Sequence, residues 1–153
     1  MLKASVEILV PFHDVDTMEI AWHGHYVKYF EIARCELLNK LGYNYKQMRD
    51  SGYAWPVIDL HIRYPGPATF DQTIIVTATL KEWENRLRIQ YEIRDSLTKR
   101  KLTKGETVQV AVNMETQQMC YESPKVLLDI MAELESTQQQ ATEQVASQQE
   151  VKQ

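Results

Sequence analysis

Apolar side chains first recur at helical spacing and later alternate with polar ones, which divides the chain into a helical part and a sheet part. The apolar residues that share one arc of a helix in the segment 24–41 are Tyr26, Phe30, Ala33, Leu37 and Leu41. Further apolar residues lie off this arc, so most of the helix circumference is apolar. Gly42 then suits the end of the helix. We therefore predict a long central helix that other structure wraps.

Later segments alternate apolar and polar residues with the period of a β-strand. The predicted strands span residues 57–64, 73–80, 87–94 and 106–114, with a further short strand at 5–10. The links at 84–85 and 96–100 suit hairpins, whereas the stretch YPGPATFD predicts a longer turn. Alternation of this kind favours an antiparallel sheet with one covered face. The pattern as a whole predicts an α+β fold.

The composition changes near the C-terminus, after a last predicted helix at residues 124–135. Residues 136–153 carry many Gln and almost no large apolar side chains. Such a segment buries too little surface to offset the entropy of ordering it. We expect a single domain over residues 1–135, followed by a Gln-rich flexible tail or a frayed helix over 136–153.

Composition and charge exclude several classes of function. The chain has 153 residues, of which 44% are hydrophobic and 25% charged, and its net charge is −4. This charge argues against general binding to nucleic acid or to a membrane surface. No run approaches the ~18 apolar residues of a membrane span, and the N-terminal residues lack the pattern of a signal peptide. The two cysteines form no CxxC, so we expect a cytoplasmic protein without membrane insertion.

The stretch FHDVDTMEIAWHGHYVKYFE, which begins at Phe12, gathers two aspartates and three histidines ahead of the helical pattern. A carboxylate can activate water or attack an acyl carbon, and Asp16 lies shortly before the helix. The first turn of a helix leaves backbone N–H groups without partners and favours negative charge. The stretch thus offers a carboxylate beside a site for an oxyanion.

The same residues also have plain structural roles. An Asp ahead of a helix is more often a cap or turn former than a base, and Asp14 is expected to hold the loop by local hydrogen bonds. The imidazole of His23 either lines a pocket or packs the loop. His23 and His25 lie two positions apart, where helical side chains splay, so we expect no metal and no cofactor.

The segment DVDTMEIAWHGHYVKYFEIARCELL resembles the signature of the 4-hydroxybenzoyl-CoA thioesterase family, which includes acyl-CoA thioesterases linked to the Tol-Pal system. The signature positions are filled here by Phe12, Asp14, Asp16, His23, Tyr26, Glu31 and Arg34. YPGPATFDQ is similar to the family's turn between strands, and LKEWENRLRIQ to the strand pair that follows it. The resemblance covers residues 6–127.

The resemblance implies a hotdog fold, in which an antiparallel sheet of about five strands wraps around one long helix. It implies hydrolysis of an acyl-CoA thioester, with Asp16 as general base or nucleophile and the backbone N–H near His23 as oxyanion donor. His23 then belongs to the catalytic site, and Tyr26 to the substrate pocket. It also implies a homodimer or homotetramer, and the outward positions expected to meet a partner are Val57, Ile75, Thr77 and Thr79.

Three charged residues complete the expected substrate site. Most family members have a Gly where this chain has Glu19, which would add a second carboxylate near the thioester and leaves an altered substrate or a lost activity open. Arg86 falls close to a basic position that the family uses near the CoA nucleotide, and Arg88 follows it. Both would hold phosphates, or would simply be solvated. A thioesterase acting on acyl carrier protein and a non-enzymatic acyl-binding module are the alternatives.

Overall fold

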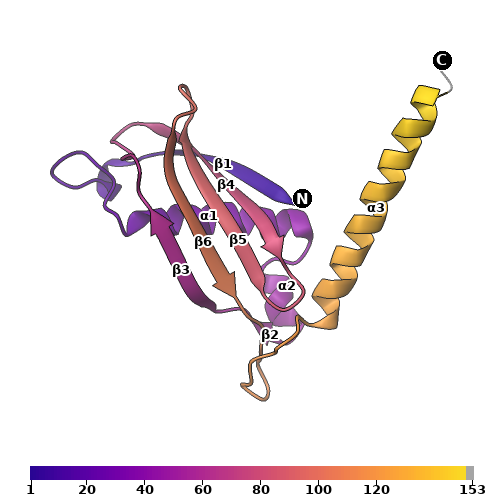
Figure 1. Ribbon diagram of the computed structural model, residues 1–153. Helices are drawn as coiled ribbons and strands as arrows, with labels where there is room; N and C mark the ends of the chain where they lie inside the picture. The colour runs from indigo at the N-terminus through magenta and orange to yellow at the C-terminus, as the bar shows by residue number, and fades with distance from the viewer. Residues whose placement is uncertain (151–153) are drawn as a thin grey trace.

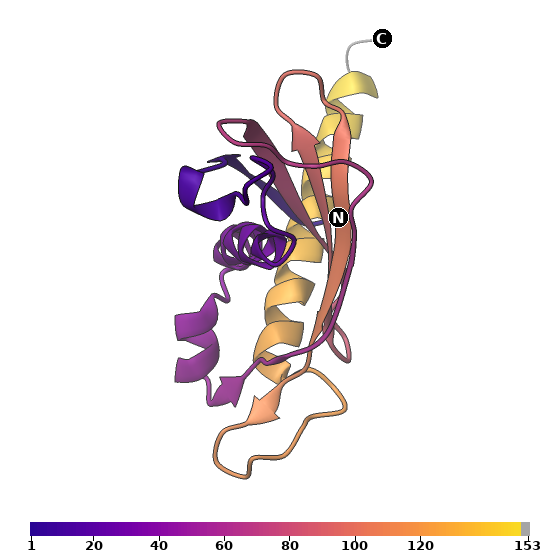
Figure 2. The same ribbon diagram turned by 90° about the vertical axis from the view of Figure 1, so that its left-hand side faces the viewer.

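The long helix and the antiparallel sheet predicted from the sequence are both present in the computed structural model, which describes residues 1–150. The strands of the main sheet are β1 (Lys3–Leu9), β3 (Val57–Arg63), β4 (Thr73–Glu82), β5 (Leu87–Asp95) and β6 (Lys101–Gln109). They are paired antiparallel in the order β1-β4-β5-β6-β3 (Figure 1). Helix α1 (His25–Leu41) lies across one face of this sheet (Figure 2). The α+β prediction is confirmed.

The smaller elements cluster beyond the C-terminal end of α1. They are the helix α2 (Tyr45–Asp50) and the two-residue strands β2 (Tyr53–Ala54) and β7 (Val112–Asn113), which pair with each other. Helix α2 was not predicted, although its sequence carries a start signal. The Asn44 side chain accepts from the Gln47 N–H, and the Gln47 side chain accepts from the Asn44 N–H. This reciprocal pair is a capping box.

The predicted fourth strand, 106–114, was placed too late in the chain. Strand β6 begins at Lys101 and ends at Gln109, and the later residues Val112 and Asn113 belong to β7 instead. The start of β6 lacks apolar alternation because Lys104 is exposed and Gly105 has no side chain. The pairing with β3 is nevertheless regular there, since Lys104 pairs with Arg63 and Gly105 with Ile62 of β3. Backbone pairing decides the strand where side-chain burial gives no signal.

Helix α1 is seated on the sheet by a close approach at Gly105. A Cβ built on Gly105 would lie 2.4 Å from the ring of Phe30, so only glycine fits beneath that ring. The same ring stacks on Tyr91 of β5 at a centroid distance of 4.5 Å. The predicted arc is buried as expected, and each of its members is at most 3% exposed: Tyr26, Phe30, Ala33, Leu37 and Leu41.

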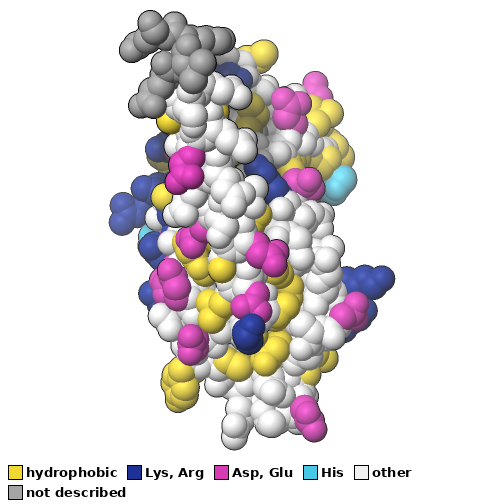
Figure 3. All heavy atoms as spheres, turned by 90° about the vertical axis from the view of Figure 1, so that its right-hand side faces the viewer, with side chains coloured by type: hydrophobic (Ala, Val, Ile, Leu, Met, Phe, Trp, Pro, Cys, Tyr) yellow, Lys and Arg dark blue, Asp and Glu magenta, His cyan; other side chains and the backbone are white. Residues whose placement is uncertain are grey.

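The last helix, α3 (Lys125–Glu150), extends well past the predicted end at residue 135. Its first turns pack on the domain through Leu127 and Met131, which are 0% and 5% exposed, and hydrophobic side chains gather there in Figure 3. Residues 135–149 are exposed yet helical. Gln, Glu and Ala have good intrinsic helix propensity, which explains why the helix continues without burial. Residues 136–150, for which we expected a flexible tail or a frayed helix, are helical up to Glu150, and residues 151–153 lie outside the described part.

The contact between Phe30 and Gly105 makes a quantitative prediction. Gly105→Ala should lower the free energy of unfolding by roughly 2 kcal/mol, because the added methyl group overpacks the space under the ring. Urea denaturation measures this change. Phe30→Leu provides the control, since it removes ring atoms from that space. If Gly105→Ala is equally destabilising with Phe30 and with Leu at position 30, the ring does not set the close approach.

Candidate active site

The acidic stretch of the sequence forms a loop at one end of the main sheet, just before α1. Backbone hydrogen bonds join this loop to the segment that precedes β4, from the Val10 N–H to the Gln72 carbonyl at 2.9 Å and from the Ala21 N–H to the Ala68 carbonyl at 2.8 Å. The first residues of the loop form a short 3-10 turn, η1 (Phe12–Asp14). The loop is thus held between two structured segments.

Asp16 lies at the turn of this loop. Its N–H donates to the Ile20 carbonyl at 2.9 Å, which closes a small hairpin. One carboxylate oxygen, Oδ1, accepts from the N–H of Met18 at 2.8 Å and more weakly from that of Ile20 at 3.4 Å. The other oxygen, Oδ2, accepts no hydrogen bond from the described residues, and the side chain is exposed. Asp16 therefore shapes the turn with one oxygen and leaves the other available.

The carboxylate of Asp16 lines a cavity of about 540 Å³ with an aromatic wall. The lining residues are Phe12, His13, Val15, Asp16, Thr17, Glu19 and Phe70. The rings of Phe12 and Phe70 meet edge to face at 5.9 Å, and they are 78% and 42% exposed. From the sequence, Phe12 was expected only as a position of the family signature, and Phe70 was not expected at the site. Phe70 lies in the YPGPATFD turn, and its place beside Asp16 depends on the pairing of Ile20 with Thr69.

Glu19 lines the same cavity and adopts an unusual backbone conformation. Its φ is 59°, in the left-handed region that glycine adopts without strain. A left-handed backbone at this position fits the glycine that the family resemblance implies there. The second carboxylate expected near Asp16 is present in the same cavity.

Asp14 ties the loop to α1, as the sequence predicted. Its side chain is 1% exposed and accepts from the Lys28 ammonium at 2.5 Å and from the Tyr29 hydroxyl at 2.8 Å. The His25 ring nitrogen lies 3.9 Å from the same carboxylate. Burial raises the pKa of Asp14, but the hydrogen bonds from Lys28 and Tyr29 outweigh burial and hold the pKa below its usual value of 3.8. The carboxylate is ionised near neutral pH.

His23 lines a second cavity, of about 290 Å³, at the N-terminus of α1. Its other lining residues include Tyr26, Tyr64 and Gly66. The Tyr64 hydroxyl donates to the His23 carbonyl at 2.8 Å, and the Tyr26 hydroxyl accepts from the Ala68 N–H at 3.0 Å. The two tyrosine rings meet edge to face at 5.0 Å. The N–H of His23 donates to no acceptor within residues 1–150, which leaves it free for a ligand oxygen.

The structure brings some of the predicted site residues together and separates others. Asp16 and Glu19 share one cavity, whereas His23 and Tyr26 share the other. Tyr26 is 2% exposed, so it forms part of the pocket wall rather than an open contact. Within one chain, the Asp16 carboxylate and the His23 side chain do not line a common cavity.

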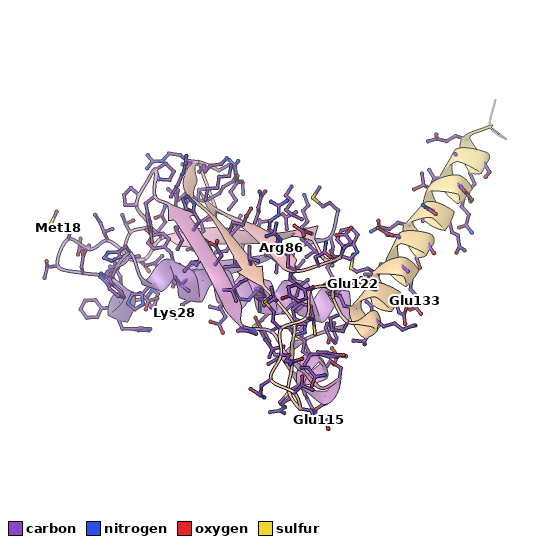
Figure 4. The ribbon with its side chains drawn as sticks, turned by 60° about the horizontal axis from the view of Figure 1, so that its bottom comes forward. Met18, Lys28, Arg86, Glu115, Glu122 and Glu133 are labelled. Carbon is purple, nitrogen blue, oxygen red and sulfur yellow. The ribbon has the colours of Figure 1, made fainter. Side chains whose placement is uncertain are left out.

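Arg86 and Arg88 lie far from the loop within one chain. They follow the distal end of β4, whose 10 residues span about 30 Å at strand spacing. Figure 4 shows Met18 and Arg86 well apart. Arg86 pairs with Glu82 at 3.0 Å, and Arg88 lies 3.6 Å from the same carboxylate and 3.1 Å from Glu106. A role for these arginines at the Asp16 site would require a second copy of the chain.

Residues 1–150 contain no group of three or more His, Cys, Asp or Glu side chains placed to hold a metal ion. In the same part of the chain, no helix is both long and apolar enough to cross a membrane.

Comparison with known proteins identifies the family and the fold. Residues 10–143 match the model of the Thioesterase-like superfamily. A putative acyl-CoA thioesterase of Bacillus subtilis, YneP, is 31% identical over 77 residues, which cover 50% of this chain and 56% of that protein. The chain thus spans about half the length of this curated relative.

Solved structures extend the likeness to almost the whole chain. A DHNA-CoA thioesterase from Staphylococcus aureus superposes with a TM-score of 0.78 at 23% identity, covering 92% of this chain and 96% of that one. A hypothetical protein from Staphylococcus aureus in complex with CoA gives a TM-score of 0.76 at 14% identity, covering 86% and 82%. The hotdog fold is confirmed. The finer assignment to the 4-hydroxybenzoyl-CoA thioesterase family stays a prediction.

The left-handed backbone of Glu19 can be tested through stability. Glu19→Gly should leave the free energy of unfolding unchanged or raise it by up to about 1 kcal/mol, because relief of backbone strain outweighs the added freedom of the unfolded chain. Urea denaturation followed by tryptophan fluorescence measures the change. Glu19→Ala is the matched control, since it removes the carboxylate and keeps the Cβ. A Gly variant less stable than the Ala variant would contradict the strain.

Proposed function

Because the chain belongs to the thioesterase-like superfamily, we propose that it hydrolyses an acyl-CoA thioester to a free acid and CoA. The observation that carries the proposal is the exposed carboxylate of Asp16 with one uncommitted oxygen, on the loop that leads into α1. The similar proteins support the substrate class, since they include the putative acyl-CoA thioesterase YneP and a DHNA-CoA thioesterase.

The chemistry needs a base and a site for the oxyanion. Asp16 takes a proton from water as the water oxygen attacks the thioester carbonyl carbon. The carbonyl oxygen becomes an oxyanion, which accepts from the free N–H of His23 at the positive end of the α1 dipole. When the tetrahedral intermediate collapses, the C–S bond breaks and the thiolate takes the proton from Asp16. In the variant mechanism, Asp16 attacks the carbon itself, and water hydrolyses the resulting anhydride.

The lining of two different cavities by Asp16 and His23 supports a site that needs residues of a second chain. Strand β3 has β6 on one side only, and its other backbone edge is free within the described residues. An open strand edge is a template for pairing with another chain. Three apolar side chains on this strand are strongly exposed for their type, at 42%, 58% and 41%: Val57, Ile58 and Leu60. We propose that β3 pairs with a second copy, whose residues complete the substrate site.

The proposal that β3 pairs with a second copy, which we call the strand-edge proposal, refines the partner-binding surface expected from the sequence. Of the outward positions expected to meet a partner, Val57 is exposed on β3, whereas Ile75, Thr77 and Thr79 are half-buried on the outer face of β4. The free edge of β3 therefore offers the larger apolar surface. Assembly of such dimers into tetramers stays a prediction.

The catalytic proposal predicts the effect of Asp16→Asn. Turnover of acyl-CoA should fall at least about 100-fold, because a general base is lost. The variant should fold normally, because the Asn side-chain oxygen can still accept from the Met18 N–H. Asp71→Asn is the matched control on the neighbouring turn and should change turnover less than about twofold. Wild-type turnover by Asp16→Asn would refute the role of Asp16.

The variant His23→Ala distinguishes a catalytic role of the His23 side chain from one of its backbone N–H. The loss of turnover should be clearly smaller than that of Asp16→Asn, because the proposed oxyanion donor is the backbone N–H. Steady-state kinetics on the same acyl-CoA gives the comparison. An equally large loss would make the imidazole itself part of the chemistry.

The strand-edge proposal predicts a dimer or a larger assembly at micromolar concentration. Leu60→Glu should shift the molar mass measured by light scattering toward the monomer, because a carboxylate would enter the buried interface. Leu97→Glu is the control, since Leu97 is 89% exposed in the turn between β5 and β6. A wild-type monomer would count against both the interface and a site completed across it.

A further inference from the structure

Three cations on one side of the main sheet form no ion pair with a carboxylate of residues 1–150. We call Arg63, Arg100 and Lys104 the cationic strip. Arg63 and Lys104 lie directly opposite each other in the register of β3 and β6, and Arg100 precedes the start of β6. All three side chains are exposed. Like charges directly opposite each other on a sheet destabilise it.

The neighbouring cations on β5 and at the start of β6 are paired with carboxylates. Lys101 pairs with Glu92 at 2.9 Å, and Arg94 also contacts that carboxylate. Arg88 lies 3.1 Å from Glu106. Within residues 1–150, no member of the cationic strip makes such a pair. The strip therefore differs from these neighbouring cations, and Glu92, which lies opposite Lys104 in the register of β5 and β6, is already engaged by Lys101 and Arg94.

A cavity of about 360 Å³ opens between these side chains. It is lined by His61, Arg63, Gln90, Lys104, Gly105 and Glu106. The single acid in the lining, Glu106, accepts from Arg88 at 3.1 Å and from Gln90 at 3.2 Å. Its charge is thus already engaged by Arg88. The remaining chemistry of the cavity suits an anion, with one guanidinium, one ammonium and an imidazole.

The cationic strip borders the cavity that contains His23. Arg63 directly precedes Tyr64, whose hydroxyl holds the His23 carbonyl. A Cβ built on Gly66 would lie 3.0 Å from Nη2 of Arg100, which places that guanidinium against the wall of the same cavity. Arg86, by contrast, lies beyond the far end of β4. Pairing of β3 through its backbone edge leaves the outer face, and therefore the strip, accessible.

We propose that the cationic strip binds the phosphates of the CoA nucleotide. The inference rests on the proposed acyl-CoA thioesterase function and assigns the donor half of the substrate to named residues. The 3′-phosphate and the pyrophosphate of CoA supply anions that a guanidinium binds with two parallel hydrogen bonds. The pantetheine arm separates them from the thioester, so they bind along the surface away from Asp16. Bound phosphate also relieves the repulsion between Arg63 and Lys104.

The test compares two small donors of the same acyl group. In the double variant Arg63→Gln/Lys104→Gln, KM for the acyl-CoA should rise about tenfold with kcat unchanged, because binding common to ground and transition states is lost. KM for the acyl-pantetheine thioester, which has no nucleotide, should stay the same. The rise should shrink as salt increases. Lys101→Gln, a paired cation on the same strand, is the matched control and should change neither KM.

Arg86→Gln tests the assignment that the sequence suggested. If this variant raises KM for acyl-CoA while the double variant does not, the proposal that the cationic strip binds the CoA phosphates is refuted. Equal KM values of the wild-type protein for the two donors would also overturn it. That result would favour acyl carrier protein as the natural donor and leave thioester hydrolysis intact.

Direct binding separates this inference from the proposed function. Adenosine 3′,5′-bisphosphate carries the nucleotide phosphates without a thioester, and calorimetry should show that the double variant binds it about tenfold more weakly than the wild type. If the protein binds this compound through Arg63 and Lys104 but hydrolyses no acyl-CoA, the phosphate-binding role of the cationic strip is supported and the proposed thioesterase function is refuted. If the wild type does not bind the compound, or if the double variant binds it equally well, the proposed phosphate-binding role of the cationic strip is refuted.

Discussion

The buried carboxylate of Asp14 holds the candidate site in place. It joins the loop to the first turns of α1 through Lys28 and Tyr29, and a charge that is 1% exposed is tolerated only when it is paired in this way. The pKa of Asp14 is lowered in the folded protein, so this anchor contributes its full stability above the usual pKa of 3.8 and loses it as pH falls through the lowered value. Asp16 and His23 both lie on the segment that the anchor positions.

The contacts of Asp14 can position the loop only because α1 itself is fixed on the sheet. Phe30 lies over Gly105, and one turn further Arg34 is buried and has no carboxylate partner within residues 1–150. Its guanidinium donates to the hydroxyls of Tyr45 at 2.6 Å and Tyr91 at 3.4 Å, which connects the helix to α2 and β5. A buried guanidinium that depends on two hydroxyls has few alternative positions. The N-terminus of α1, with the free N–H of His23, is therefore rigid relative to the sheet.

Periodicity in the sequence predicted the elements whose side chains are buried within one chain. It failed where a close backbone approach, an exposed strand or the register between distant strands decides the structure. The arc of α1 was recovered because its side chains meet the sheet. The start of β6 was missed because Gly105 meets Phe30 instead of presenting an apolar side chain. Alternation on β3 predicted a covered face, yet Leu60 is 41% exposed in one chain. Asp16 could be singled out from its local motif, whereas the place of Arg63 opposite Lys104 depends on a register between distant strands.

Three locally unfavourable features lie on the candidate-site loop or along β3. Glu19 has a left-handed backbone, Arg63 faces Lys104 on the neighbouring strand, and the outer edge of β3 pairs with no strand within residues 1–150. Beyond the far end of β4, Arg86 is neutralised by Glu82. Stability alone would distribute such features at random or remove them, since each lowers the free energy of unfolding. Binding explains the last two features better than stability does, because an anionic ligand would relieve the repulsion and a second copy would cover the edge.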